Sequence, residues 1–307
     1  MNKGILFKTM KARGVDEGIC KVIQGMYEEE ESAIIMNGNS GKWFKIEKGV
    51  RQGGCSSPVC FNFVPNELAW EIEKSPYGIK LPGGKKIGIL LYADDIVLID
   101  DTERGLQGLC GIVEEWLKKY KLRINFEKSE AVSYGTRKDP HIRIQEMVLK
   151  VSDYYKYLGF ITEKTVRGKG HIKDRKNKMK NALGFFLGLT NTLEGLPVEK
   201  RRTMARACIE TVGLYGTETM VSTDKHMRVI EELEVIQRRH ARNLLRASRN
   251  TANEIVTMEL GLMTVKGMMD LRLLAFRHRM ACENKGTLNE TMYKLNKARG
   301  LGWEKDA

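Results

Sequence analysis

Two adjacent aspartates, Asp94 and Asp95, lie between two apolar stretches and are the residues of this sequence best suited to metal chemistry. Neighbouring carboxylates in apolar surroundings are costly because of desolvation and mutual repulsion, unless a cation, usually a divalent one, neutralises them. On a tight turn at least one of the two can point at a shared metal. The alternative is an exposed Asp-Asp turn, because aspartate is a favoured turn residue.

Two clusters of basic residues could bind a polyanion. The first lies within residues 164–180 and includes Lys173, Arg175 and Lys176. The second contains Arg238, Arg239 and Arg242, on a helical pattern whose other face is apolar. Contacts from such side chains to phosphates would be largely independent of base sequence and steeply sensitive to salt. The alternative for either cluster is a solvated cationic surface.

The net charge of +13 has an uneven distribution along the 307 residues. Residues 1–135 carry 19 basic and 19 acidic side chains, whereas residues 136–307 carry 33 and 20. A basic surplus of this size is typical of proteins with a polyanionic partner. The sequence therefore predicts an electrically balanced first half followed by a region that binds a polyanion.

The composition, 42% apolar and 30% charged, is that of a globular protein with one large domain or two ordinary ones. Because no apolar run approaches about 18 residues and the first ten residues do not form a signal peptide, we expect a soluble intracellular protein. The six cysteines form no C-x-x-C pair and no cluster with histidine, so we expect reduced, mostly buried thiols.

The elements that must position the aspartates follow from periodicity and turn signals. We expect the aspartates at the tip of a hairpin of two buried strands within residues 87–99. Another hairpin is expected from the stretches 32–36 and 42–47, which flank the turn 37–41. A Gly-rich loop, 49–54, precedes a helix in which Pro65 marks a kink or an early turn. The helices predicted in this half are 5–12, 17–27, 59–72 and 103–120, and the remaining strands are 131–134, 147–151 and 155–161.

Beyond residue 171 the pattern is almost entirely helical. The predicted helices are 171–193, 198–214, 226–247, 253–260, 265–282 and 288–298. We place a domain boundary near residue 165, giving an α+β domain over 1–164 and an all-α, basic domain over 165–307.

Several short motifs occur in a characteristic order. Arg51-Gln52-Gly53 precedes Tyr92-Ala93-Asp94-Asp95 by about forty residues, and Asn125-Phe126-Glu127-Lys128-Ser129 and Tyr157-Leu158-Gly159 follow. Together they resemble the palm motifs of reverse transcriptases of non-LTR retrotransposons, over about residues 1–161. Two later segments, 214–218 and 259–261, resemble regions that often follow the polymerase domain in such elements. The resemblance implies an incomplete right-hand palm, with a mixed or antiparallel sheet and packed helices, followed by a helical thumb.

The resemblance also implies roles for individual residues. Asp94 matches the first acid of the family's Y-x-D-D turn, which binds both catalytic Mg²⁺ ions for nucleotidyl transfer, and Asp95 matches the second, a supporting carboxylate at the metal site. Tyr92, Tyr157, Leu158 and Gly159 would lie near the primer terminus. Gln52, Gly53 and Lys128 would line the pocket for nucleotide and template, with Lys128 positioned to neutralise or protonate the leaving pyrophosphate. Considered without the resemblance, Lys128 could equally be a solvated lysine, 51–53 a plain turn and 157–159 an ordinary strand end.

The implied partners are an RNA template, a DNA primer and deoxynucleoside triphosphates, with no membrane and a nuclear location if the element is eukaryotic. Lys173, Arg175, Lys176, Arg238, Arg239 and Arg242 would contact the nucleic-acid backbone.

The family uses a further catalytic aspartate, in a strand just before the helix that corresponds to residues 5–12. Matching Asn2-Lys3-Gly4-Ile5-Leu6 to the residues after that strand places this aspartate a residue or two upstream of Met1. We therefore expect a truncated or decayed copy with little or no polymerase activity. The alternatives are a non-catalytic nucleic-acid-binding remnant of such an element and, with less support, a relative of group II intron maturases or telomerase.

Overall fold

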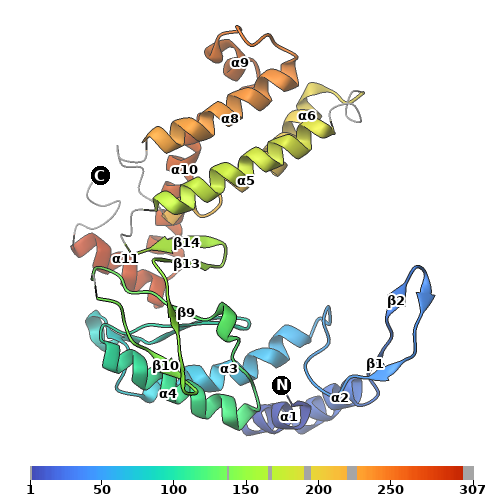
Figure 1. The fold of residues 1–307 in the computed structure, drawn as a ribbon, viewed down its shortest axis with the longest axis vertical. Coiled ribbons are helices and arrows are strands. Elements are labelled where there is room, and N and C mark those ends of the chain that lie inside the picture. The colour runs from blue at the N-terminus through green and yellow to red at the C-terminus, as the bar shows by residue number, and fades with distance from the viewer. Residues whose placement is uncertain (1, 137, 165–167, 190–194, 220–226, 300–307) are drawn as a thin grey trace. The chain divides into compact units, whose positions relative to one another are not determined.

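The structure is a computed structural model, and it describes residues 2–136, 138–164, 168–189, 195–219 and 227–299 (Figure 1). The side chains of residues 227–229 are not described. The chain forms two compact units. The first contains Met1–Ala131 and Lys138–Ser152, and the second contains Val132–Arg137 and Asp153–Ala307. Both helices and strands are present, as expected for an α+β protein.

Four helices build the first unit, at the positions that the periodicity predicts to within a few residues. They are α1 (Lys3–Ala12), α2 (Glu17–Glu28), α3 (Ser57–Lys74) and α4 (Glu103–Tyr120). Side chains just before three of them accept hydrogen bonds from otherwise unpaired N–H groups of the first turn: Asn2, Asp16 and Thr102. The apolar faces meet in one core that includes Leu6, Leu68 and Leu109.

Pro65 lies in the interior of α3 and not in an early turn of the helix. Proline there lacks the N–H that would bond to the carbonyl four residues earlier. Next to it, the buried indole of Trp116 on α4 donates a hydrogen bond of 3.1 Å to the carbonyl oxygen of Val64. This bond and the apolar contacts around it fix α4 against α3.

The strands are short, and each sheet in the described residues has two strands. A hairpin is present where one was predicted, but its turn is the two residues Asn37-Gly38 rather than 37–41, because residues 39–40 already pair with 35–36. Both turn residues have positive φ, of 51° and 81°, as a tight hairpin turn requires. In the first unit the paired strands are β1 (Glu31–Ser32) with β4 (Phe44–Lys45), β2 (Ile35–Met36) with β3 (Asn39–Ser40), β5 (Ile79–Lys80) with β6 (Lys86–Ile87), β7 (Ile89–Tyr92) with β8 (Asp95–Leu98), β10 (Arg143–Ile144) with β11 (Met147–Val148), and β12 (Lys150–Val151) with β9 (Glu130–Ala131). The β12–β9 pair is parallel and the others are antiparallel.

The second unit begins with a hairpin where the sequence pattern predicted one strand over 155–161. Strand β13 (Tyr154–Tyr157) turns at Leu158-Gly159 into the antiparallel β14 (Phe160–Glu163). The prediction was wrong because the turn contains leucine in a left-handed conformation, which the usual turn signals do not anticipate.

Helices form the rest of the second unit. They are α5 (Lys169–Gly188), α6 (Val198–Ala205), α7 (Thr211–Gly213), α8 (Met227–Leu245), α9 (Asn253–Glu259), α10 (Val265–His278) and α11 (Leu288–Ala298). The helix predicted over 198–214 is interrupted by a π-helical segment, Arg206–Glu210, and a second one, Arg279–Glu283, follows α10. A separate apolar core, with Ile209, Leu233 and Val256 fully buried, holds these helices together.

The division between the compact units falls at residues 152 and 153, before the β13–β14 hairpin. Segment 132–137 joins the second unit, where the Tyr134 hydroxyl and the Thr162 hydroxyl lie 2.6 Å apart in a hydrogen bond. The functional boundary near residue 165 stays a prediction.

Three of the six cysteines, Cys20, Cys60 and Cys110, are buried, and Cys55, Cys208 and Cys282 are exposed. All six are free thiols, as expected, but the expectation that most are buried was wrong. Within the described residues, no helix has the length and apolarity needed to cross a bilayer.

Candidate active site

The aspartate pair lies at the tip of the β7–β8 hairpin, as predicted. Tyr92 pairs with Asp95, and Ala93 and Asp94 form the two-residue turn between them. Ala93 has a φ of 51°, a left-handed conformation that brings the strands round tightly. Asp94, Asp95 and the Tyr92 side chain are all exposed. The turn therefore presents two carboxylates and an aromatic ring to solvent.

The strands below the turn hold it against the helices. Ile89, Ile96 and Leu98 pack on the first unit's core, although the strands are half-buried rather than fully buried as expected. β7 contacts α3 and β8 contacts α4. Two packed helices thus support the exposed aspartates.

Two glycines at the base of this hairpin were missed by the sequence reasoning. Gly78 has a φ of 104°, and a Cβ atom there would lie 2.9 Å from the Cα of Gly88. A Cβ on Gly88 would lie 2.9 Å from Cγ2 of Ile72 on α3. Neither position has room for a side chain. The two glycines therefore allow three segments to lie close together: the chain before β5, the start of β7, and α3.

Asp100 is a second positioning residue that sequence reasoning missed. Its carboxylate accepts hydrogen bonds from the Gly78 N–H at 2.6 Å and from the Thr102 N–H and hydroxyl at 2.8 Å each. Burial would raise the pKa of Asp100, but these hydrogen bonds together hold the pKa below its ordinary value. An Asp-x-Thr sequence just before a predicted helix was the available signal, because Thr102 caps α4.

The Gly-rich loop leads directly into α3. Arg51, Gln52 and Gly53 are exposed, and Gly53 has a φ of 83° with open space where a Cβ would be. The N–H of Gly54 donates to the carbonyl of Arg51 at 3.2 Å, and the Ser57 hydroxyl lies 3.1 Å from the buried Tyr27 hydroxyl. The loop is thus a hydrogen-bonded turn that leads directly into α3, and the Gln52 side chain is accessible to a ligand.

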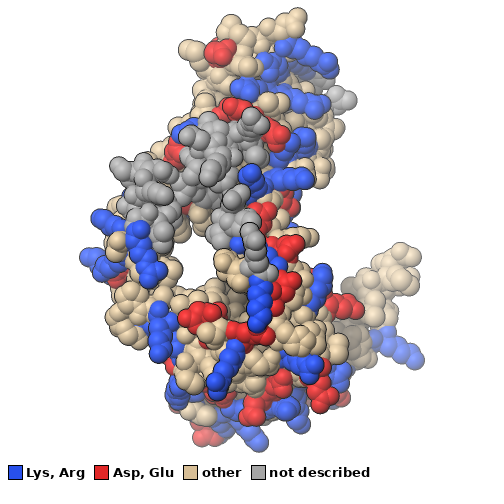
Figure 2. Space-filling model, turned by 60° about the vertical axis from the view of Figure 1, so that its left-hand side comes forward, with Lys and Arg blue, Asp and Glu red and all other residues tan. Residues whose placement is uncertain are grey.

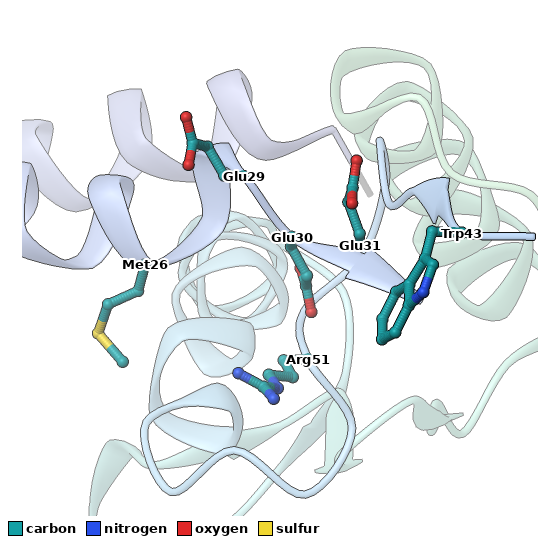
Figure 3. A pocket seen from close by; sticks show the side chains of 6 residues that line it. All are labelled: Met26, Glu29, Glu30, Glu31, Trp43 and Arg51. Atoms are coloured by element: carbon teal, nitrogen blue, oxygen red, sulfur yellow. The ribbon is translucent and has the colours of Figure 1, made fainter. Parts of the chain in front are cut away.

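A hollow of about 470 Å³ lies beside this loop, between the end of α2 and the β1–β4 ribbon (Figure 3). Its lining is Met26, Glu29, Glu30, Glu31, Trp43 and Arg51. Glu30 is paired with Lys3 at 3.1 Å, which ties α1 to the ribbon. Three carboxylates around the hollow disfavour a triphosphate by repulsion, so we do not assign the nucleotide to it.

Lys128 is exposed in a short 3-10 turn, Phe126–Lys128, that follows α4. Phe126 packs on the core, and the Ser129 hydroxyl donates a 2.8 Å hydrogen bond to the carbonyl of Asn125. Among the described residues, no hydrogen bond or ion pair links Asp94 or Asp95 to Gln52 or Lys128. These residues share the first unit, whereas Tyr157, Leu158 and Gly159 form a turn of the second.

The fit of Mg²⁺ to the aspartate turn can be judged from the donor set. Carboxylate oxygen is the ligand that Mg²⁺ prefers. However, no group of three or more acidic, histidine or cysteine side chains that could hold a metal occurs in the described part of the chain. The turn therefore has the right kind of ligand but too few carboxylates for a pair of divalent cations.

The six basic residues predicted to contact nucleic acid differ in their surroundings. Lys173 and Arg239 are exposed and have no partner among the described residues. Lys176 pairs with Glu232 at 2.6 Å and Arg238 with Glu234 at 3.8 Å.

The other two basic residues are engaged within the second unit. Arg175 is 5% exposed and is held by Asp174 and by the carbonyl of Gly159. Arg242 bonds to the carbonyl of Thr251 at 3.0 Å and to the side chain of Asn253. This geometry favours a structural role for Arg175 and Arg242. Figure 2 shows how basic and acidic side chains are distributed over one face of the molecule.

Comparisons with known proteins identify the family. Residues 4–162 match the reverse transcriptase (RNA-dependent DNA polymerase) family. The match covers more than half of the chain and includes the turn between β13 and β14. A Pol polyprotein of the type-1 retrotransposable element R2 from Popillia japonica is 24% identical over 236 residues, covering 74% of this chain and 32% of the relative. A polymerase of the mobile element jockey from Drosophila funebris is 23% identical over 224 residues, covering 69% of this chain and 23% of the relative.

An R2 Pol polyprotein from Nasonia vitripennis is 29% identical over 151 residues, covering 45% of this chain and 14% of the relative. The chain thus spans about a third or less of the length of these relatives. The match to the family nevertheless covers all the motifs from Gln52 to Gly159. The chain therefore belongs to the reverse transcriptase (RNA-dependent DNA polymerase) family, a family of nucleotidyltransferases, and its domain is of the kind found in non-LTR retrotransposons.

Proposed function

We propose that this chain is the palm and thumb part of an RNA-directed DNA polymerase, which extends a DNA primer on an RNA template. The observation that carries the proposal is the exposed Tyr92-Ala93-Asp94-Asp95 turn, which packs through its strands on α3 and α4 inside the region that matches the family. Two adjacent exposed carboxylates on a supported hairpin are suited to bringing a divalent cation to a reacting phosphate.

Asp94 and Asp95 are, in this proposal, the contribution of the chain to a two-Mg²⁺ site. When bound, the metals would supply charge stabilisation for phosphoryl transfer. The turn offers two carboxylates, and no group of three or more possible metal ligands occurs in the described residues, so the turn offsets only half of the four positive charges of two Mg²⁺ ions. We therefore expect the chain by itself to support little or no polymerisation.

The other residues singled out in the sequence take the remaining roles. Gln52 and Gly53 contact the incoming nucleotide or the template base, since the loop is exposed and the open space at Gly53 permits close backbone approach. Lys128 contacts the triphosphate, because its ammonium is exposed and has no described partner. The Tyr157–Gly159 turn contacts the primer strand.

Primer extension on a poly(rA) template with an oligo(dT) primer tests this function. We would compare the chain with an extended protein in which a strand carrying one further aspartate precedes Asn2. The extended protein should incorporate dTMP in a Mg²⁺-dependent manner, and the chain alone should incorporate much less. Equal robust incorporation by both proteins would contradict the expectation of an impaired site.

A second candidate function is non-catalytic binding of nucleic acid by the basic helices. Lys173 and Arg239, which are exposed and have no partner within the described part of the chain, favour it. Each of Lys173→Gln and Arg239→Gln should reduce the slope of log affinity against log salt concentration by about one. Lys8→Gln, at an exposed lysine of α1, is the matched control and should leave the slope unchanged. Affinity that does not depend on salt would contradict both functions.

A further inference from the structure

The turn between β13 and β14 has an unusual residue in a demanding conformation. Leu158 and Gly159 both have positive φ, 47° and 80°, like Asn37 and Gly38 in the β2–β3 turn. Asparagine and glycine adopt this conformation readily, whereas leucine does so at a cost in free energy. A leucine at this position therefore needs support from the surrounding structure.

Tyr215 provides that support from a loop 57 residues further along the chain. Its hydroxyl donates a hydrogen bond of 2.7 Å to the carbonyl oxygen of Leu158. Its ring lies against Gly159, where a Cβ atom would be 3.2 Å from Cε1 of the ring. The same tyrosine thus holds one peptide group of the turn and leaves little room for a side chain at the next residue.

Arg175 on α5 holds the other carbonyl of the turn. Its Nη2 group donates to the carbonyl oxygen of Gly159 at 3.4 Å, and its guanidinium lies 5.4 Å from the centre of the Tyr215 ring. Arg175 is buried and its charge is paired with Asp174. The turn, α5 and the Tyr215 loop are thereby joined through one cation–π contact and two hydrogen bonds.

His171 fixes the Tyr215 loop in turn. Its Nδ1 accepts a 3.2 Å hydrogen bond from the N–H of Ile161, so Nε2 carries the proton and donates to the carbonyl of Tyr215 at 2.8 Å. The imidazole is fully buried, with its centre 4.2 Å from that of the Phe160 ring. The histidine therefore bridges β14 and the Tyr215 loop in a single neutral tautomer.

Both carbonyl groups of the turn accept hydrogen bonds from residues of the same unit, and Leu158 remains 37% exposed. We propose that Tyr215, supported by Arg175 and His171, is a positioning residue that locks the Tyr157–Gly159 turn so that Leu158 contacts the primer strand in a fixed orientation. This inference rests on the proposed polymerase function. It assigns a shared role to two sequence motifs, Tyr157-Leu158-Gly159 and Leu214-Tyr215-Gly216, because the second holds the first in place.

Tyr215→Phe tests the proposal, because it removes one hydroxyl and keeps the ring. We would measure the dissociation constants of the chain for a recessed DNA primer on an RNA template and for single-stranded RNA of the same length. The variant should bind the primer–template about fivefold more weakly, the effect of one lost hydrogen bond, and single-stranded RNA unchanged. Tyr293→Phe, at a half-buried tyrosine of α11, should change neither affinity.

A coupled variant makes the test specific to the strained leucine. In a Leu158→Asn background, which accepts the left-handed conformation, Tyr215→Phe should cost less than in the wild-type background. Hydrogen exchange of residues 154–163 should be faster in Tyr215→Phe and unchanged in Tyr293→Phe. Equal loss of affinity for both ligands, or the same cost in both backgrounds, would overturn the positioning role.

Failure of this inference can be told apart from failure of the proposed function. If the wild-type chain binds primer–template no better than single-stranded RNA, the polymerase function fails and the primer contact fails with it. If the wild-type preference exists and survives Tyr215→Phe, only the role of Tyr215 is refuted.

Discussion

Acid should destabilise the second unit through His240, which lies on α8 and is 1% exposed. Burial lowers the pKa of His240 from 6.5 to about 4. The unfolded chain therefore binds a proton below pH 6.5 that the folded chain takes up only near pH 4. The destabilisation begins as the pH falls below 6.5 and is complete below 4, since the unfolded state binds more protons throughout that window.

The magnitude follows from the two pKa values. A difference of about 2.5 units corresponds to about 3.4 kcal/mol when fully expressed, of which about 2 kcal/mol is lost between pH 7.5 and pH 5. His240→Leu removes the titrating group, so the free energy of unfolding of this variant should fall by about 2 kcal/mol less than that of the wild type over the same pH range. His171, whose pKa is also lowered by burial, acts in the same direction in both proteins.

Urea unfolding followed by far-UV circular dichroism, together with hydrogen exchange of the α8 amides, would measure the effect. The exchange data report on the second unit by itself. His278→Leu, at an exposed histidine of α10, is the control and should keep the wild-type dependence on pH. If wild type and His240→Leu lose the same stability between pH 7.5 and pH 5, the buried, neutral state of His240 is refuted.

Two further predictions concern the first unit and the thiols. Gly108→Ala should destabilise the protein by about 1 to 3 kcal/mol, because the added Cβ would lie 2.3 Å from the Tyr77 ring. Gly111→Ala on the same helix adds a methyl group in open space and should stabilise the protein by about 1 kcal/mol. Thermal unfolding monitored by tryptophan fluorescence would measure both, and equal effects would contradict the packing. Iodoacetamide at pH 8 should alkylate the exposed thiols of the native protein, Cys55, Cys208 and Cys282, and should spare the buried ones, Cys20, Cys60 and Cys110. Burial also raises the pKa of Cys110 to about 11 and raises the pKa of Cys60. Peptide mass spectrometry would identify the labelled thiols, and rapid labelling of Cys110 would contradict the burial.

Local signals were sufficient for much of the fold. The helix predicted over 103–120 has those bounds in the structure, because an apolar period of 3.6 and the cap at Thr102 agree. A hairpin at Asn37-Gly38 was predictable because asparagine and glycine readily adopt the positive φ that a tight hairpin turn requires. The position of Asp94 and Asp95 at a hairpin tip also follows from two apolar stretches on either side.

Tertiary packing decided what the sequence pattern could not. Leu158-Gly159 forms a turn because Tyr215 and Arg175 hold its carbonyls, and neither is a neighbour in sequence. Burial likewise distinguishes Arg175 from the exposed Lys173 two residues earlier, although both belong to the same basic run. A charge pattern alone cannot separate a cation that binds phosphate from one that holds a helix in place.

The most direct test of the central claim is single-nucleotide incorporation by the extended protein with and without Asp94→Asn. Asp94→Asn keeps the size of the side chain and removes its charge, so we expect the rate of dTMP incorporation to fall by at least about a hundredfold. Glu73→Gln, at an exposed carboxylate of α3, should retain the full rate. Incorporation that is Mg²⁺-dependent in the unsubstituted protein and unchanged in Asp94→Asn would show that the chemistry does not take place at this turn.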